Sequence, residues 1–172
     1  YPFLPLQLSL LGAATIGTPA FFLALEPNHE RVHGRFISNV LRAALPGGIT
    51  DFLLVFLAQG FCFAFDLSSD YLGTISTIVV LTVGLMVLWG VCRPFNTWHW
   101  VLWGAMAVIG YGGALLLAPW LGLVKLDLGG TLVLVALLGL AGPTLFGVNM
   151  LNTRIHGAVG EVQDKVRRRR EP

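Results

Sequence analysis

Five apolar stretches of about 20 residues each dominate this sequence and leave it few possible folds. They cover residues 4–25, 43–65, 71–91, 98–120 and 128–151. Each is long enough to cross a membrane, because the hydrocarbon core is about 30 Å thick and a helix rises about 1.5 Å per residue. Backbone polar groups cannot stay unpaired in lipid, and the stretches lack the alternation of barrel strands. We therefore predict an all-α membrane protein with five transmembrane helices.

Composition supports the same class. The chain has 172 residues, of which 55% are hydrophobic and 12% are charged. Soluble domains carry about 25% charged residues, so most of this surface must face a lipid bilayer. We expect a transmembrane domain over residues 1–152 and a basic cytoplasmic tail over residues 153–172.

The basic residues predict the orientation of the five spans. All lysines and arginines except Lys125 lie in the loop after the first span, in the loop after the third span, or towards the tail. Basic loops stay on the cytoplasmic side of a membrane. We therefore expect a multi-pass protein of the plasma (inner) membrane with its N-terminus outside and its C-terminus in the cytoplasm.

The beginning of the chain predicts a longer protein. The sequence starts at Tyr1 without a methionine, and no charged segment precedes the first apolar run, as it would in a signal peptide. An odd number of spans with an external start also predicts at least one further helix before Tyr1.

The middle of the first span combines a proline with small and hydroxylated residues. Pro19 lacks the N–H that would bond the carbonyl of Thr15, and Gly12 and Gly17 flank the region. A helix broken at this depth leaves carbonyl and hydroxyl oxygens free, and hard cations prefer oxygen ligands. Thr15, Thr18 and Pro19 are therefore candidates for a cation pathway. The alternative is a proline-kinked packing helix whose small residues allow close approach.

The same span resembles a helix of a known family. The carrying residues are Pro5-Leu6-Gln7-Leu8, Thr15, Gly17, Pro19-Ala20, Leu23 and Pro27. They resemble the sixth transmembrane helix of P-type cation ATPases, which reads roughly P-x-Q-L-x-x-x-N-x-x-T-D-G-x-P-A-x-x-L-x-x-x-P. The end of the span at Glu26-Pro27-Asn28, followed by a basic loop, is most similar to the CtpE-like bacterial branch.

This resemblance implies that the five spans correspond to helices six to ten of a P-type ATPase. The intact enzyme would use ATP and magnesium to form an aspartyl phosphate and would export a cation, with calcium as the expected cargo. The phosphorylation motif D-K-T-G-T and a phosphate-binding glycine loop do not occur in this sequence. This segment should therefore bind neither ATP nor magnesium, and its partners would be the preceding helices and cytoplasmic domains of the same pump.

The sequence departs from the family pattern at two ligand positions. Gly12 and Ile16 stand where animal-type calcium pumps have an asparagine and an aspartate, and only Thr15 matches a ligand position. The resemblance therefore implies Thr15 as a metal ligand, with further ligands from Thr18, backbone carbonyls and helices outside this chain.

Asp51 is the one carboxylate expected within a span. A charge at the membrane centre costs about 2.5–3.5 kcal/mol on insertion scales, which makes Asp51 a candidate for ion handling. The alternative is structural: Pro46-Gly47-Gly48 would break the helix, and Thr50 or Asp51 would cap its restart.

The remaining polar groups carry weaker hypotheses. In the family, the loop after the sixth helix touches the phosphorylation domain, so Arg31, Arg35 and Arg42 are candidates for coupling. His29 and His33 are four residues apart, a spacing that can bind a metal, but no cysteine or carboxylate cluster completes such a site, so we expect ordinary loop histidines. The run Arg167 to Arg170 has no aromatic residues interleaved, so we expect no nucleic-acid binding.

Two other functions remain open at this point. One is a non-enzymatic five-helix membrane scaffold or a small secondary carrier. The other keeps the pump but changes the cargo to magnesium or a monovalent cation.

Overall fold

The computed structural model describes residues 3–26, 36–93 and 96–168. Every regular element in these ranges is helical, and five helices are long and apolar enough to cross a membrane, as predicted. The elements are α1 (Pro5–Gly12), the π-helical turn η1 (Ala13–Gly17), α2 (Thr18–Ala24), α3 (Phe36–Ala64), α4 (Ser69–Val91), α5 (Thr97–Leu116) and α6 (Leu128–Arg168). Together α1, η1 and α2 form the first span.

Local side-chain caps fix where several helices begin. Pro5 occupies the first turn of α1, where its missing N–H costs nothing. The side chain of Asn96 accepts a hydrogen bond from the N–H of Thr97 at 2.7 Å, and Asp127 Oδ1 accepts from the N–H of Gly130 at 2.7 Å. These contacts satisfy N–H groups that have no partner inside the helix.

A tight turn joins α3 to α4. The N–H of Leu67 donates to the carbonyl of Cys62 at 2.9 Å, and Asp66 adopts a positive φ of 51°. This is the geometry of a helix end closed by a left-handed residue, a role usually taken by glycine or asparagine. The two helices therefore run antiparallel.

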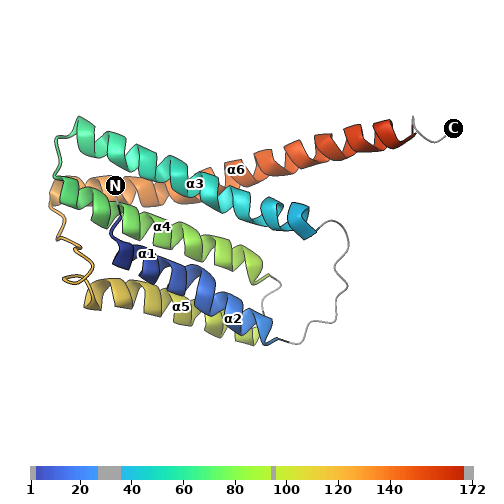
Figure 1. The fold of residues 1–172 in the computed structure, drawn as a ribbon. Coiled ribbons are helices and arrows are strands. Elements are labelled where there is room, and N and C mark those ends of the chain that lie inside the picture. Colours follow the sequence, from blue (N-terminus) through green and yellow to red (C-terminus); the bar gives the residue numbers. More distant parts are fainter. Residues whose placement is uncertain (1–2, 27–35, 94–95, 169–172) are drawn as a thin grey trace.

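The helix α4 lies at the centre of the bundle (Figure 1). Half of its membrane-length segment is buried, against 28% or less for each other span. One face of α4 packs with α3 and α6 in a cluster around Leu54, Val79 and Leu137. The other packs with the first span and α5 around Ala14, Leu81 and Met106.

Two glycines let neighbouring helices approach α4 closely. A Cβ on Gly84 would lie 2.6 Å from Cγ2 of Thr15, and one on Gly110 of α5 would lie 2.8 Å from Cδ1 of Leu81. Such contacts are typical of membrane helices, whose association depends on close packing.

The last helix is longer than its membrane span. Its apolar segment is Leu128–Ile155, and the helix continues to Arg168 through most of the segment predicted as a tail. Figure 1 shows this C-terminal part extending beyond the other helices.

Candidate functional site

The backbone of the first span departs from α-helical geometry at the predicted position, but it does not break. Residues Ala13–Gly17 form a π-turn, in which the N–H of Thr18 donates to the carbonyl of Ala13. The expectation of an opened helix is therefore wrong. The turn accommodates Pro19 because the backbone N–H groups before it bond the carbonyl five residues earlier and not four. The helix therefore continues on both sides.

The π-turn still leaves backbone oxygen without its usual donors. The carbonyl of Ala14 would normally accept from the N–H of Thr18, which instead bonds Ala13. The next residue is Pro19, which has no N–H to offer. The carbonyl that loses its donor at the π-turn is thus that of Ala14, one residue before the predicted Thr15 carbonyl.

Thr15 is held in place by two contacts. Its hydroxyl donates to the carbonyl of Leu11 at 2.7 Å, and its methyl group lies against Gly84 of α4. The hydroxyl oxygen keeps its acceptor capacity, because the hydrogen bond to Leu11 uses its proton. Thr18 is half-buried and Pro19 is buried, whereas Ile16 is 69% exposed. The outer face of the first span therefore presents an alkyl group where the family has an aspartate.

Asp51 lies inside an uninterrupted helix. The helix α3 runs through Pro46 without a break, and the hydroxyl of Thr50 donates to the carbonyl of Pro46 at 2.7 Å. The interpretation of Thr50 or Asp51 as the cap of a restarted helix is therefore wrong. A proline within a membrane helix is tolerated where a nearby hydroxyl and neighbouring helices re-satisfy the backbone.

The side chain of Asp51 faces a groove of about 330 Å³ between the first span and α3. We call it the Asp51 groove; its lining residues are Phe3, Leu8, Asp51, Phe52, Val55, Phe56, Gln59 and Val80. The oxygen Oδ1 of Asp51 is buried, and no described residue forms a hydrogen bond with it. Neither Thr15 nor Thr18 lines this groove, so the structure does not gather the predicted pathway residues into one cavity.

A second pair of polar residues joins the far end of the first span to α5. His99 Nε2 lies 2.8 Å from Glu26 Oε2, and the His99 side chain is only 13% exposed. His99 lies in the first turn of α5, within the predicted fourth span. Burial, and secondarily the Glu26 carboxylate, raises the pKa of Cys92 at the end of α4 above its usual range. Spacing along the chain could not reveal this pair, because 73 residues separate its members.

Gln7, part of the motif, has a structural role that sequence reasoning missed. It is 1% exposed, its amide Nε2 donates to the carbonyl of Leu121 at 2.8 Å, and its Oε1 accepts from the N–H of Leu4 at 2.9 Å. Both functions of the amide are used, so Gln7 ties the start of the first span to the loop after α5.

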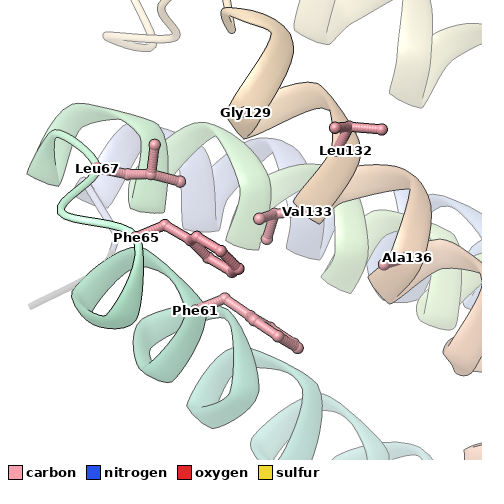
Figure 2. A pocket seen from close by; sticks show the side chains of 7 residues that line it. All are labelled: Phe61, Phe65, Leu67, Gly129, Leu132, Val133 and Ala136. Carbon is pink, nitrogen blue, oxygen red and sulfur yellow. The ribbon is translucent and has the colours of Figure 1, made fainter.

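A hollow lined only by apolar side chains lies elsewhere and offers no polar chemistry. It measures about 440 Å³ between the end of α3 and the start of α6 (Figure 2). Its lining residues are Phe61, Phe65, Leu67, Gly129, Leu132, Val133 and Ala136. Because none of them carries a polar side-chain atom, this hollow cannot ligate a cation.

Other predicted residues lie outside what the structure describes. Arg31 and Arg35 fall outside the described residues, and for Arg42 in α3 the backbone is described but not the side chain. Within residues 3–26, 36–93 and 96–168, no three His, Cys, Asp or Glu side chains gather in a way that could hold a metal ion. Thr15 therefore remains a predicted ligand without a cluster of acidic partners from this chain.

Comparison with known proteins tests the resemblance seen in the first span. The calcium-transporting ATPase CtpE of Mycolicibacterium smegmatis is 33% identical over 115 residues, covering 64% of this chain and 14% of that protein. The calcium-transporting ATPase CtpE of Mycobacterium bovis is 31% identical over 106 residues, covering 59% of this chain and 13% of that protein. The chain is a relative of the CtpE-type cation-transporting ATPases.

A more distant match agrees with the CtpE-type relationship. The probable cation-transporting ATPase exp7 of Streptococcus pneumoniae is 25% identical over 102 residues, covering 59% of this chain and 13% of that protein. The matched part of the chain spans about one seventh of the length of its mycobacterial CtpE relatives. No family model and no solved structure matches it.

Proposed function

We propose that this chain is the C-terminal membrane part, helices six to ten, of an ATP-driven cation pump of the P-type. The observation that carries the proposal is the similarity to the mycobacterial CtpE proteins, together with five helices of membrane length. The intact pump would couple ATP hydrolysis to cation export through an aspartyl phosphate. The first span would form one wall of the ion pathway, and the central α4 with α3, α5 and α6 would hold that wall in place.

The proposed cargo is calcium, because the relatives with more than 30% identity are named calcium-transporting ATPases. Calcium takes six to eight oxygen ligands in flexible geometry. The wall offers the hydroxyls of Thr15 and Thr18 and the carbonyl of Ala14, which loses its donor at the π-turn. Carboxylates and further oxygens would come from helices outside this chain, since Gly12 and Ile16 supply none. Magnesium or a monovalent cation is the alternative cargo.

The rest of the pump would supply the chemistry that this segment lacks. ATP and magnesium would bind in cytoplasmic domains that contact the loop of Arg31, Arg35 and Arg42. The protein would lie in the plasma membrane, with the Leu4 and Leu121 end of the bundle outside and the C-terminal end of α6 in the cytoplasm. Asp51 is not counted in the wall, because Thr15 and Thr18 do not line the groove that Asp51 faces.

The test uses the full-length pump in inverted membrane vesicles. We expect calcium to stimulate ATP hydrolysis and to accumulate in the vesicles in an ATP-dependent way. The Thr15→Val variant should raise the calcium concentration needed for half-maximal stimulation, because it removes one oxygen ligand and keeps the side-chain shape.

Thr77→Val is the matched control. Thr77 also donates to a carbonyl four residues earlier, that of Gly73 at 2.8 Å, and it is buried in α4. Both variants therefore lose the same kind of hydrogen bond, but only Thr15 lies on the proposed pathway. Equal calcium dependence in the two variants would remove Thr15 from the pathway, and an absence of cation-stimulated ATP hydrolysis would overturn the proposed function itself.

A further inference from the structure

Asp51 is an acidic residue within a membrane span. No described residue forms a hydrogen bond with its buried oxygen Oδ1. The residue lies in the apolar segment Ala43–Ala64, and its Oδ1 is one of two buried side-chain nitrogen or oxygen atoms without a hydrogen bond among the described residues. The other is Oγ of Ser76, one helical turn before the groove-lining Val80 on α4. Buried polar groups in folded proteins are almost always paired, and acidic residues within spans face the interior of a bundle.

The Asp51 groove lies between the first span and α3, and one residue of α4 also lines it. The first span packs on α4 and α5, and α3 packs on α4 and α6, so α4 contacts both walls of the groove. Figure 1 shows α4 at the centre of the bundle, and Val80 of α4 lines the groove. Phe52 and Phe56, both on the groove, are 67% and 66% exposed. Exposed aromatic side chains beside a carboxylate with one buried oxygen are suited neither to water nor to lipid alone.

The lining is too poor in oxygen to be a cation site made by this chain. Asp51 and Gln59 carry the polar side chains of the groove, and the other lining residues are apolar. Eight residues separate the two along α3, which corresponds to about 12 Å of helix. One cation could not be bound by both, and a hard cation requires about six oxygen ligands.

A lipid chain would also leave the groove unsatisfied, because it would cover the phenylalanines but offer no donor to Asp51. A helix that presents an apolar face with one ammonium, guanidinium or amide group would cover the phenylalanines and also donate a hydrogen bond to Asp51. The CtpE relative from Mycolicibacterium smegmatis is about five times as long as this chain, because 115 aligned residues make up 14% of it, so the longer polypeptide would offer further helices. Of the three occupants compared, only such a helix matches both the apolar surface of the groove and the charge of Asp51.

We propose that the Asp51 groove receives one further transmembrane helix of the same polypeptide, and that a basic or amide side chain on this helix pairs with Asp51. The proposal rests on the proposed function, because it requires the longer protein. It assigns Asp51 to the assembly of the bundle and not to ligation of the transported cation.

The test is site-specific photo-crosslinking in the full-length protein, with benzoyl-phenylalanine in place of Phe56. Phe146 of α6 is the matched control, because it is 72% exposed and does not line the groove. We expect the Phe56 probe to crosslink to one apolar segment outside this chain that contains a basic or amide side chain near its middle. The Phe146 probe should not label that segment. Crosslinks from Phe56 only to lipid, or only to α1, α3 and α4, would overturn the proposal.

Variants of Asp51 then test the pairing itself. We expect Asp51→Leu to lower the yield of this crosslink at least fivefold, while Asp51→Asn, which still accepts a hydrogen bond, keeps at least half of it. Removing the donor of the mapped segment together with Asp51→Leu should restore the yield towards that of the wild type. An unchanged yield in Asp51→Leu would overturn the pairing. Cation-stimulated ATP hydrolysis is measured on the same membranes, so failure of the groove and failure of the pump proposal are distinguished.

Discussion

Thr15 of the first span and Gly84 of α4 are in direct contact, and the contact depends on the missing side chain of the glycine. A Cβ on Gly84 would lie 2.6 Å from Cγ2 and 2.9 Å from Cβ of Thr15, which is closer than real Cβ atoms come. The atoms it would meet are near the backbone of the π-turn and have little freedom to move. The candidate wall is therefore positioned by a glycine on another helix.

Gly84→Ala should separate the first span from α4. Overpacking of this kind typically costs about 1–3 kcal/mol. We expect the thermal midpoint of the purified chain in detergent, followed by circular dichroism, to fall. If the proposed function holds, the same variant of the full-length protein should need a higher calcium concentration for half-maximal ATP hydrolysis, because Thr15 is displaced.

Gly90→Ala in the same helix is the control for the Gly84 variant. Nothing lies within 4 Å of a Cβ at Gly90, so only the effect of alanine on the helix remains, a stabilisation of up to about 1 kcal/mol. If Gly84→Ala melts at the same temperature as Gly90→Ala, the close contact described for Thr15 does not exist in the protein.

Gln7→Leu should destabilise the start of the first span. The substitution removes the hydrogen bond to the carbonyl of Leu121 and leaves the N–H of Leu4 without its acceptor. A buried group that loses its partner costs about 1–3 kcal/mol. Thermal melting of the purified chain measures the effect. Gln59→Leu, at an exposed position of α3, should change the midpoint little, and an equal loss in both variants would argue against the bridge.

Cys92 should react with N-ethylmaleimide more slowly at pH 8 than an ordinary thiol. Burial, and secondarily the carboxylate of Glu26, raises the pKa of Cys92, and the thiolate is the reactive form. Because the pKa of Cys92 is higher in the folded state, its neutral form stabilises the fold below the unfolded-state pKa. That contribution is lost as the pH rises through the folded-state pKa.

The Glu26→Gln variant tests the second cause of the Cys92 shift. Removing the carboxylate should lower the pKa of Cys92 and raise its rate of modification at pH 8, measured by mass spectrometry. Cys62, in the apolar segment of α3, serves as an internal control whose rate should not change. A parallel increase at both thiols would indicate general loosening of the structure and not an electrostatic effect.

The number of spans could be predicted because backbone hydrogen bonds must be satisfied in lipid, whatever the side chains do. The two proline sites could not be predicted in detail. At Pro19 the choice between an open break and a π-turn depends on a shift of one residue in hydrogen-bond partners. At Pro46 the hydroxyl of Thr50 and packing on α4 and α6 keep the helix continuous, and neither is visible as a local pattern.

In the candidate site, too, the sequence predicts local features but not the contacts between helices. The motif predicts Thr15 as a candidate, because its residue type and its position four residues before Pro19 can both be read from the local sequence. Its contact with Gly84 and the pairing of Glu26 with His99 join residues 69 and 73 positions apart, so they depend on how the helices pack. The orphaned oxygen of Asp51 is also a result of packing, because it depends on which face of α3 meets α4.

The predicted orientation can be tested with single cysteines on the two sides of the bundle. Lys125, in the loop between α5 and α6, and Arg93, after α4, are both exposed, whereas Cys62 and Cys92 are buried. A membrane-impermeant maleimide added to intact cells should label Lys125→Cys and leave Arg93→Cys unlabelled until the cells are permeabilised. The basic side of a membrane protein stays in the cytoplasm, which gives this direction its physical reason. Labelling of Arg93→Cys in intact cells, with Lys125→Cys protected, would invert the bundle and place the Glu26 and His99 pair at the outer surface.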